Sequence, residues 1–101
     1  LKTVWMYDNQ LNGTIPRSIG NLASLTQLYL FQNRLTGMIP ETIGNLVSLK
    51  NLDLRYNQLT GAIPAAIGNL SSTVMLDISD NQLSGTIPES IGNLVALNRL
   101  T

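Results

Sequence analysis

The sequence predicts an α/β solenoid, a stack of short units that each contain one strand and one helical turn. The first observation is a run of related tetrapeptides, GTIP, GMIP, GAIP and GTIP, which begin 24 residues apart at positions 13, 37, 61 and 85. The second is the string IGNL, which recurs in the same phase at 19–22, 43–46, 67–70 and 91–94. Self-similarity at a fixed period of this length is the signature of repeat architectures. The chain therefore divides into units 1–24, 25–48, 49–72 and 73–96, with a partial unit at 97–101.

Each unit is expected to begin with a short strand. Leu28 and Leu30 alternate with Tyr29 and Phe31, a period of two that predicts one buried and one open face. The same phase places the other strands near 4–6, 52–54 and 76–78.

A turn and a helical segment complete the unit. Gly37 permits unusual backbone angles, and Pro40 fixes φ and removes a hydrogen-bond donor. The stretch 40–46 then suits a short helical turn that starts with Pro and ends near Gly44. One unit cannot bury its leucines alone, so stacking predicts a continuous aliphatic core and a parallel sheet with rungs about 4.8 Å apart.

Composition excludes several classes of function. The 101 residues hold six basic and six acidic side chains and no net charge, which argues against nucleic acid and anionic membrane surfaces as partners. The absence of Cys and His removes the common metal ligands and the usual catalytic triads. We expect no enzyme, no metal and no cofactor, and no membrane contact. The chain starts and stops within a unit and opens without a signal peptide, which favours a piece of a longer protein.

The pattern LxxLxLxxNxLxGxIPxxIGxL, read at 25–46, resembles the plant-type class of leucine-rich repeats. The resemblance covers the whole chain. It implies a curved solenoid with a parallel β-sheet on the concave face and short helical turns on the convex side. It also implies a second short strand near each GxIP segment. Ectodomains of receptor-like kinases and receptor-like proteins are built this way, as are polygalacturonase-inhibiting proteins.

Two features depart from the family pattern. Thr73 stands in a core column that otherwise holds leucine, and its buried hydroxyl needs a partner, or a shift of the backbone at 71–74, to avoid a cost of about 1–3 kcal/mol. The family's terminal caps are missing. We therefore expect frayed ends, with self-association through them as one outcome.

An asparagine column, Asn9, Asn33, Asn57 and Asn81, precedes a leucine by two residues in every unit. We interpret it as structural, because amides can donate to and accept from the backbone of neighbouring turns. Function is expected where the units differ, at the open positions of the strands. The candidate ligand-binding residues there are Trp5, Tyr7, Tyr29, Phe31, Asp53, Arg55, Tyr56, Asp77, Asp80 and Arg99.

The candidates fall into two groups. Trp5, Tyr7, Tyr29 and Phe31 form a two-by-two aromatic block on adjacent rungs, either a ligand-contacting patch or plain sheet cover, and we favour the patch. Asp53 and Asp77 share a column one rung apart, which would suit a cation site or an acid–base pair. For them we favour a solvated face that Arg55 partly neutralises.

Two N-glycosylation sequons begin at Asn12 and Asn69, and sugar there would fit a secreted protein. We predict a binding module for a peptide or protein ligand on the concave face, part of a receptor ectodomain that is extracellular or at the cell surface. The alternatives are a secreted inhibitor of a wall-degrading enzyme and an ice-binding or adhesive solenoid. The uneven column Thr14, Met38, Ala62, Thr86 counts against ice binding.

Overall fold

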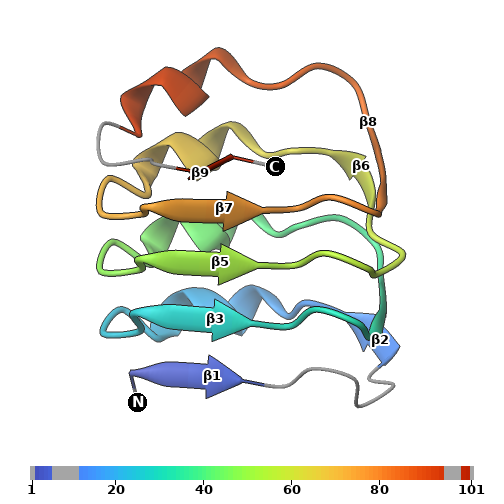
Figure 1. Cartoon of the computed structure of the whole chain (residues 1–101), viewed down its shortest axis with the longest axis horizontal. Helices are drawn as coiled ribbons and strands as arrows, with labels where there is room; N and C mark the ends of the chain where they lie inside the picture. The colour runs from blue at the N-terminus through green and yellow to red at the C-terminus, as the bar shows by residue number, and fades with distance from the viewer. Residues whose placement is uncertain (1, 6–11, 95–98, 101) are drawn as a thin grey trace.

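The computed structural model describes residues 2–5, 12–94 and 99–100, and one parallel sheet forms a face of the molecule (Figure 1). The sheet holds five strands in the order β1-β3-β5-β7-β9. Their bounds are Thr3–Trp5 for β1, Gln27–Tyr29 for β3, Asn51–Asp53 for β5, Met75–Asp77 for β7 and Arg99–Leu100 for β9. Each paired residue lies 24 positions from its partner, as with Leu28 and Leu52. We call each strand, with the segment that follows it up to the next strand, a rung.

The predicted strands are confirmed in place and begin one residue earlier than expected. Met6, at the end of the first predicted strand, lies outside the described residues. Leu30 follows β3, yet it is buried, and its amide donates to the Asp53 carbonyl. The backbone bonding between rungs therefore continues past the strand ends, where the boundary is a matter of degree.

A second set of short strands lies near the GxIP segments, as the family resemblance implies. These are β2 (Asn12–Thr14), β4 (Arg34–Thr36), β6 (Thr60–Ala62) and β8 (Gln82–Ser84), paired as β2 with β4 and β6 with β8. The Thr60 amide donates to the Gly37 carbonyl and links the two pairs. Gly61 has a φ of 73°, a backbone angle that favours glycine over any residue with a Cβ.

Short helices close each unit on the far side of the sheet (Figure 1). They are the 3-10 helices η1 (Arg17–Asn21), η2 (Glu41–Asn45), η3 (Ala65–Asn69) and η4 (Glu89–Asn93). A proline in extended conformation precedes each one, as the sequence predicts for 40–46. Gly68 of η3 packs so tightly on the next unit that a Cβ would lie 2.5 Å from Cβ of Ser90.

The core between the sheet and these helices is aliphatic. Leu28, Leu52 and Leu76 of successive strands are fully buried, as are Ile43 and Ile67 of η2 and η3. Composition predicts such a core, because the chain has few aromatic residues. The repeated burial shows that each unit covers its neighbour, which makes the stack the source of stability.

Thr73 finds the partner that its burial requires. Its side chain is fully buried, and Oγ1 donates to the Leu49 carbonyl at 2.8 Å. The Thr73 amide donates to the Leu70 carbonyl at 3.0 Å, the same turn bond that Leu49 makes to Leu46. The threonine is therefore accommodated by a hydrogen bond between rungs, with the turn preserved.

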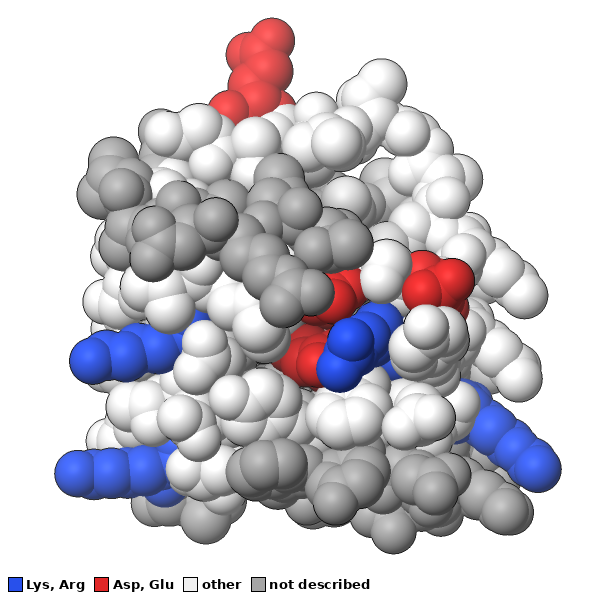
Figure 2. All heavy atoms as spheres, in the orientation of Figure 1, with Lys and Arg blue, Asp and Glu red and all other residues white. Residues whose placement is uncertain are grey.

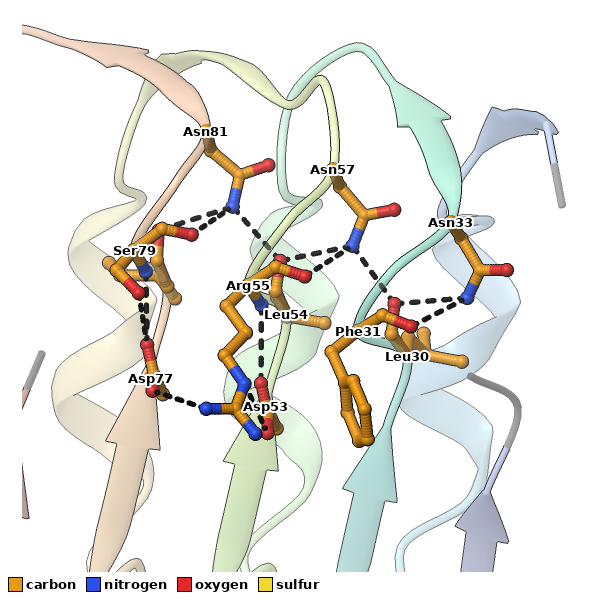
Figure 3. A network of polar contacts seen from close by, with 11 residues as sticks. Leu30, Phe31, Asn33, Asp53, Leu54, Arg55, Asn57, Asp77, Ser79 and Asn81 are labelled. Carbon is orange, nitrogen blue, oxygen red and sulfur yellow. Dashed lines mark hydrogen bonds and ion pairs between the residues drawn. The ribbon is translucent and has the colours of Figure 1, made fainter. Parts of the chain in front are cut away.

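The asparagine column is structural, as predicted. Asn57 Nδ2 donates to the carbonyls of Leu30, Leu54 and Arg55 at 2.9, 3.0 and 3.2 Å, and its Oδ1 accepts from the Leu35 amide at 3.1 Å. Asn81 repeats this arrangement one rung later (Figure 3). One amide thus bonds two rungs together. Asn9 lies outside the described residues.

Candidate binding face

The open face of the sheet, opposite the 3-10 helices, carries the positions that differ between units. The register places Gln27, Asn51 and Met75 in one column and Tyr29, Asp53 and Asp77 in the next. All of these side chains are partly exposed except the two aspartates. The repeat therefore fixes the positions of the side chains on this face, while their residue types differ from unit to unit.

Asp53, Arg55 and Asp77 form one carboxylate–guanidinium cluster (Figure 3). Arg55 Nε lies 3.2 Å from Asp53 Oδ2, and Arg55 Nη1 lies 3.9 Å from Asp77 Oδ2. Figure 2 shows acidic atoms on both sides of a basic side chain near the middle of this face. The arginine therefore bridges two rungs.

The expectation of a solvated charged face is wrong for these carboxylates. Asp53 and Asp77 are each only 3% exposed. Asp53 Oδ1 accepts a bond from the Arg55 amide, and Asp77 Oδ1 accepts from the amide and the hydroxyl of Ser79, at 3.1 and 2.7 Å. The physical reason is local: each carboxylate folds back onto the backbone two residues ahead, and the arginine covers the pair. The sequence correctly predicts that the two aspartates are neighbours in register.

This geometry bears on the two other readings of the aspartate pair. In the described part of the chain, no group of three or more His, Cys, Asp or Glu side chains could hold a metal ion. The carboxylates are already engaged by backbone amides, a hydroxyl and a guanidinium. The two carboxylates therefore hold the local backbone and the Arg55 side chain in place, and Arg55 is the member of the cluster that reaches the surface.

The aromatic group and the charged group meet at one contact. The guanidinium carbon of Arg55 lies 5.0 Å from the centre of the Phe31 ring, on the preceding rung. That distance is typical of a cation–π interaction. Phe31 and Arg55 occupy the same column of the repeat, 24 residues apart, but the repeat pattern alone does not show that the two groups meet there.

The four-ring aromatic block is only partly described. Tyr29 and Phe31 are partly exposed on this face, and Trp5 pairs with Tyr29 through its backbone in β1. Tyr7 lies outside the described residues, and Trp5 and Arg99 are described by their backbone alone. The contiguity of the block therefore stays a prediction.

Tyr56 and Asp80 lie at the edge of the face, in a backbone conformation that the sequence did not reveal. Together with Gln32 they have φ values of 56°, 55° and 57°. All three side chains are exposed. The three residues recur every 24 positions, so the repeat implies one shared backbone conformation. None of them is a glycine, the residue that usually marks a positive φ, so the sequence did not indicate which conformation they share.

Of the two sequon asparagines, Asn69 is exposed as the last residue of η3. Asn12 is the first residue of β2, described by its backbone alone. Among the described residues, no helix is long and apolar enough to span a membrane.

Comparison with protein families gives matches along most of the chain. Models described as leucine rich repeat match residues 32–83 and 47–101, and a further one matches residues 1–22. A search of curated proteins finds no match.

Solved structures of plant receptors are similar over nearly the whole chain. The ectodomain of the Arabidopsis thaliana membrane receptor kinase GASSHO1/SCHENGEN3, in complex with CASPARIAN STRIP INTEGRITY FACTOR 2, is 45% identical over 95% of this chain, with a TM-score of 0.93. The plant peptide hormone receptor RGFR1, in complex with RGF2, is 42% identical over 98% of it, with a TM-score of 0.96. The Arabidopsis thaliana BIR2 ectodomain is 41% identical over 96%, with a TM-score of 0.92. The chain spans 12%, 16% and 51% of these three structures.

Proposed function

Since this chain belongs to the leucine-rich repeat family, we propose that it is a ligand-binding segment of an extracellular receptor ectodomain. The ligand is a peptide or a protein segment, and it binds along the open face of the five-stranded sheet. Catalysis has no part in this function. Any enzymatic activity of a larger protein would belong to another domain.

The observation that carries the proposal is the likeness to receptor ectodomains with bound peptides. Two similar structures, at 45% and 42% identity, are complexes with CASPARIAN STRIP INTEGRITY FACTOR 2 and with RGF2. A third, at 36% identity, is the receptor kinase HAESA with the peptide hormone IDA and the co-receptor SERK1. Those complexes support a peptide as the class of ligand for this chain.

The chemistry of the open face fits such a ligand. Tyr29 and Phe31 give partly exposed aromatic surface, which contributes large contact area at low cost in rotamer entropy. Arg55 beside Phe31 extends this surface with a guanidinium that is about a third exposed. Aromatic residues and arginine are enriched among the residues that dominate binding energy.

The extracellular setting is part of the same proposal. Asn69 heads a sequon and is exposed at the end of η3, away from the sheet face, where a sugar would leave the ligand face open. Asn12 is the second candidate for this modification. Mass spectrometry of the chain secreted from plant cells, before and after glycosidase treatment, checks both positions.

The test of binding is a selection from a phage-displayed library of random linear 12-residue peptides on the immobilised chain. Peptides should be enriched over a blank surface, and calorimetry with one selected peptide should give a measurable Kd. Tyr29→Ala should raise that Kd about tenfold or more. Val47→Ala is the matched control, because Val47 is 52% exposed and lies outside the sheet. Absence of enrichment, or equal Kd values for wild type and Tyr29→Ala, would contradict the proposal.

A further inference from the structure

Three exposed side chains form a ledge along one edge of the open face: Gln32, Tyr56 and Asp80. They occupy the same position on three successive rungs, just before Asn33, Asn57 and Asn81. Backbone bonds hold the ledge, because the Gln32 amide donates to the Arg55 carbonyl and the Tyr56 amide donates to the Ser79 carbonyl. The side chains are therefore carried by a fixed framework.

The backbone of the ledge is unfavourable for the residues it carries. All three have φ between 55° and 57°, where a Cβ raises the free energy relative to glycine. The other positive-φ column, which includes Gly37 and Gly61, holds glycine in every unit. Retaining a side chain at a strained position is a reason to look for a function there.

The ledge side chains make no polar contact of their own. Within residues 2–5, 12–94 and 99–100, no hydrogen bond or ion pair involves the side chain of Gln32, Tyr56 or Asp80. The carboxylate–guanidinium cluster is the opposite case, since Asp53 and Asp77 are buried and engaged by Arg55, Ser79 and backbone amides. Of the acceptor side chains in the ledge and the cluster, those of the ledge are the ones left free for a ligand.

We propose that the ledge, and not the buried carboxylates of Asp53 and Asp77, supplies the hydrogen-bond acceptors for a bound peptide, with Tyr56 as the central anchor. The inference rests on the proposed function and adds the place of polar recognition to it. The occupant is an extended peptide that crosses the rungs. Rungs are about 4.8 Å apart and an extended chain rises about 3.3 Å per residue, so three ledge positions span about three peptide residues.

The chemistry of the ledge matches a peptide backbone with available N–H groups. The Asp80 carboxylate only accepts hydrogen bonds, the Gln32 amide donates and accepts, and the Tyr56 hydroxyl does both. Tyr56 is also 52% exposed, so its ring offers apolar area between the two polar neighbours. An N–H group or a cationic group of the peptide would lie against Asp80.

The experiment uses the full chain and one peptide selected on wild type from the phage library. Tyr56→Ala and Tyr56→Gly should each raise its Kd about tenfold or more, while Val47→Ala leaves it unchanged. Asp80→Asn should weaken binding more than Asp77→Asn does. Tyr56→Gly should melt about 2–8 °C above Tyr56→Ala, because both lack the ring and only alanine keeps the strained Cβ, while the larger unfolded-chain entropy of glycine offsets about half of that gain.

The outcomes separate the inference from the proposed function. If Tyr56→Ala binds as wild type while Tyr29→Ala loses affinity, the ledge is overturned and the binding face stands. A larger loss in Asp77→Asn than in Asp80→Asn also overturns the ledge. Failure to enrich any peptide overturns both. The two melting temperatures confirm that the Tyr56 variants are folded and test the strain separately.

Discussion

The hydroxyl of Thr73 donates a hydrogen bond of 2.8 Å to the carbonyl oxygen of Leu49, its counterpart on the preceding rung. Thr73→Val keeps the shape and removes the donor, so we expect the free energy of unfolding to fall by about 1 kcal/mol. The loss should not exceed the value of one hydrogen bond. Leu49 fills the equivalent position one rung earlier without a hydroxyl, so the fold accepts an apolar side chain there. Urea unfolding followed by circular dichroism measures it. Thr73→Ser, which keeps the bond and loses a methyl group, is the comparison, and a Thr73→Val midpoint equal to wild type would show that the bond adds nothing.

Arg55 neutralises two buried carboxylates, so its removal should be costly. Arg55→Ala leaves Asp53 and Asp77 uncompensated, and we expect a loss of about 1–3 kcal/mol, less than for a fully buried pair because Arg55 is about a third exposed. Arg34→Ala is the control, since Arg34 is exposed in β4, and should change stability by less than about 0.5 kcal/mol. Adding Asp77→Asn to Arg55→Ala should recover part of the loss. Equal stability of the Arg55 and Arg34 variants would contradict this account of the cluster.

Two glycines at equivalent positions should respond oppositely to alanine. A Cβ at Gly68 would lie 2.5 Å from Cβ of Ser90, whereas nothing described lies within 4 Å of one at Gly92. Gly68→Ala should therefore destabilise the chain by about 1–3 kcal/mol. Gly92→Ala should be neutral or stabilise it by up to about 1 kcal/mol, because it reduces the entropy of the unfolded chain. Thermal unfolding of the two variants side by side decides the matter, and the prediction fails if both shift equally.

Replacing a residue of the asparagine column should lower the free energy of unfolding far more than replacing an asparagine on the helical side. Asn57→Ala removes three donated bonds and one accepted bond from buried backbone groups, so we expect a loss of about 2–4 kcal/mol. Asn69→Ala, at an exposed position, should cost less than about 0.5 kcal/mol. Denaturant unfolding checks both. A small effect at Asn57 would mean that water replaces these bonds without penalty.

The fold was predicted closely because the same 24-residue pattern of buried and turn residues occurs four times. The same position of the second, third and fourth units holds a leucine, at Leu28, Leu52 and Leu76. Because side chains in a strand alternate with a period of two, these leucines fix which face of each strand is buried. The strand boundary was misplaced by one residue, since hydrogen bonding between rungs extends past the strand, as at Leu30. The alternation of side chains therefore predicts which face of a strand is buried, but it does not predict the residue at which the strand ends.

The site was less predictable because it depends on contacts across rungs. Alternation placed Asp53 and Asp77 on the open face and therefore in water, yet both are buried. Their burial comes from the reach of the Arg55 side chain and from bonds to nearby amides, which no period in the sequence encodes. The positive φ at Tyr56 was missed for a similar reason, since tyrosine gives no signal of that conformation.

The most direct test of the central claim, that the open face of the sheet binds a peptide, is chemical-shift mapping of the labelled chain with a library-selected peptide. We predict that the largest shifts fall on the sheet and its edge, at Tyr29, Phe31, Arg55, Tyr56 and Met75. Residues on the helical side, such as Thr42, Val47 and Asn69, should stay unchanged at saturation. Shifts that cluster on η2 and η3 and leave β3, β5 and β7 unperturbed would contradict the account.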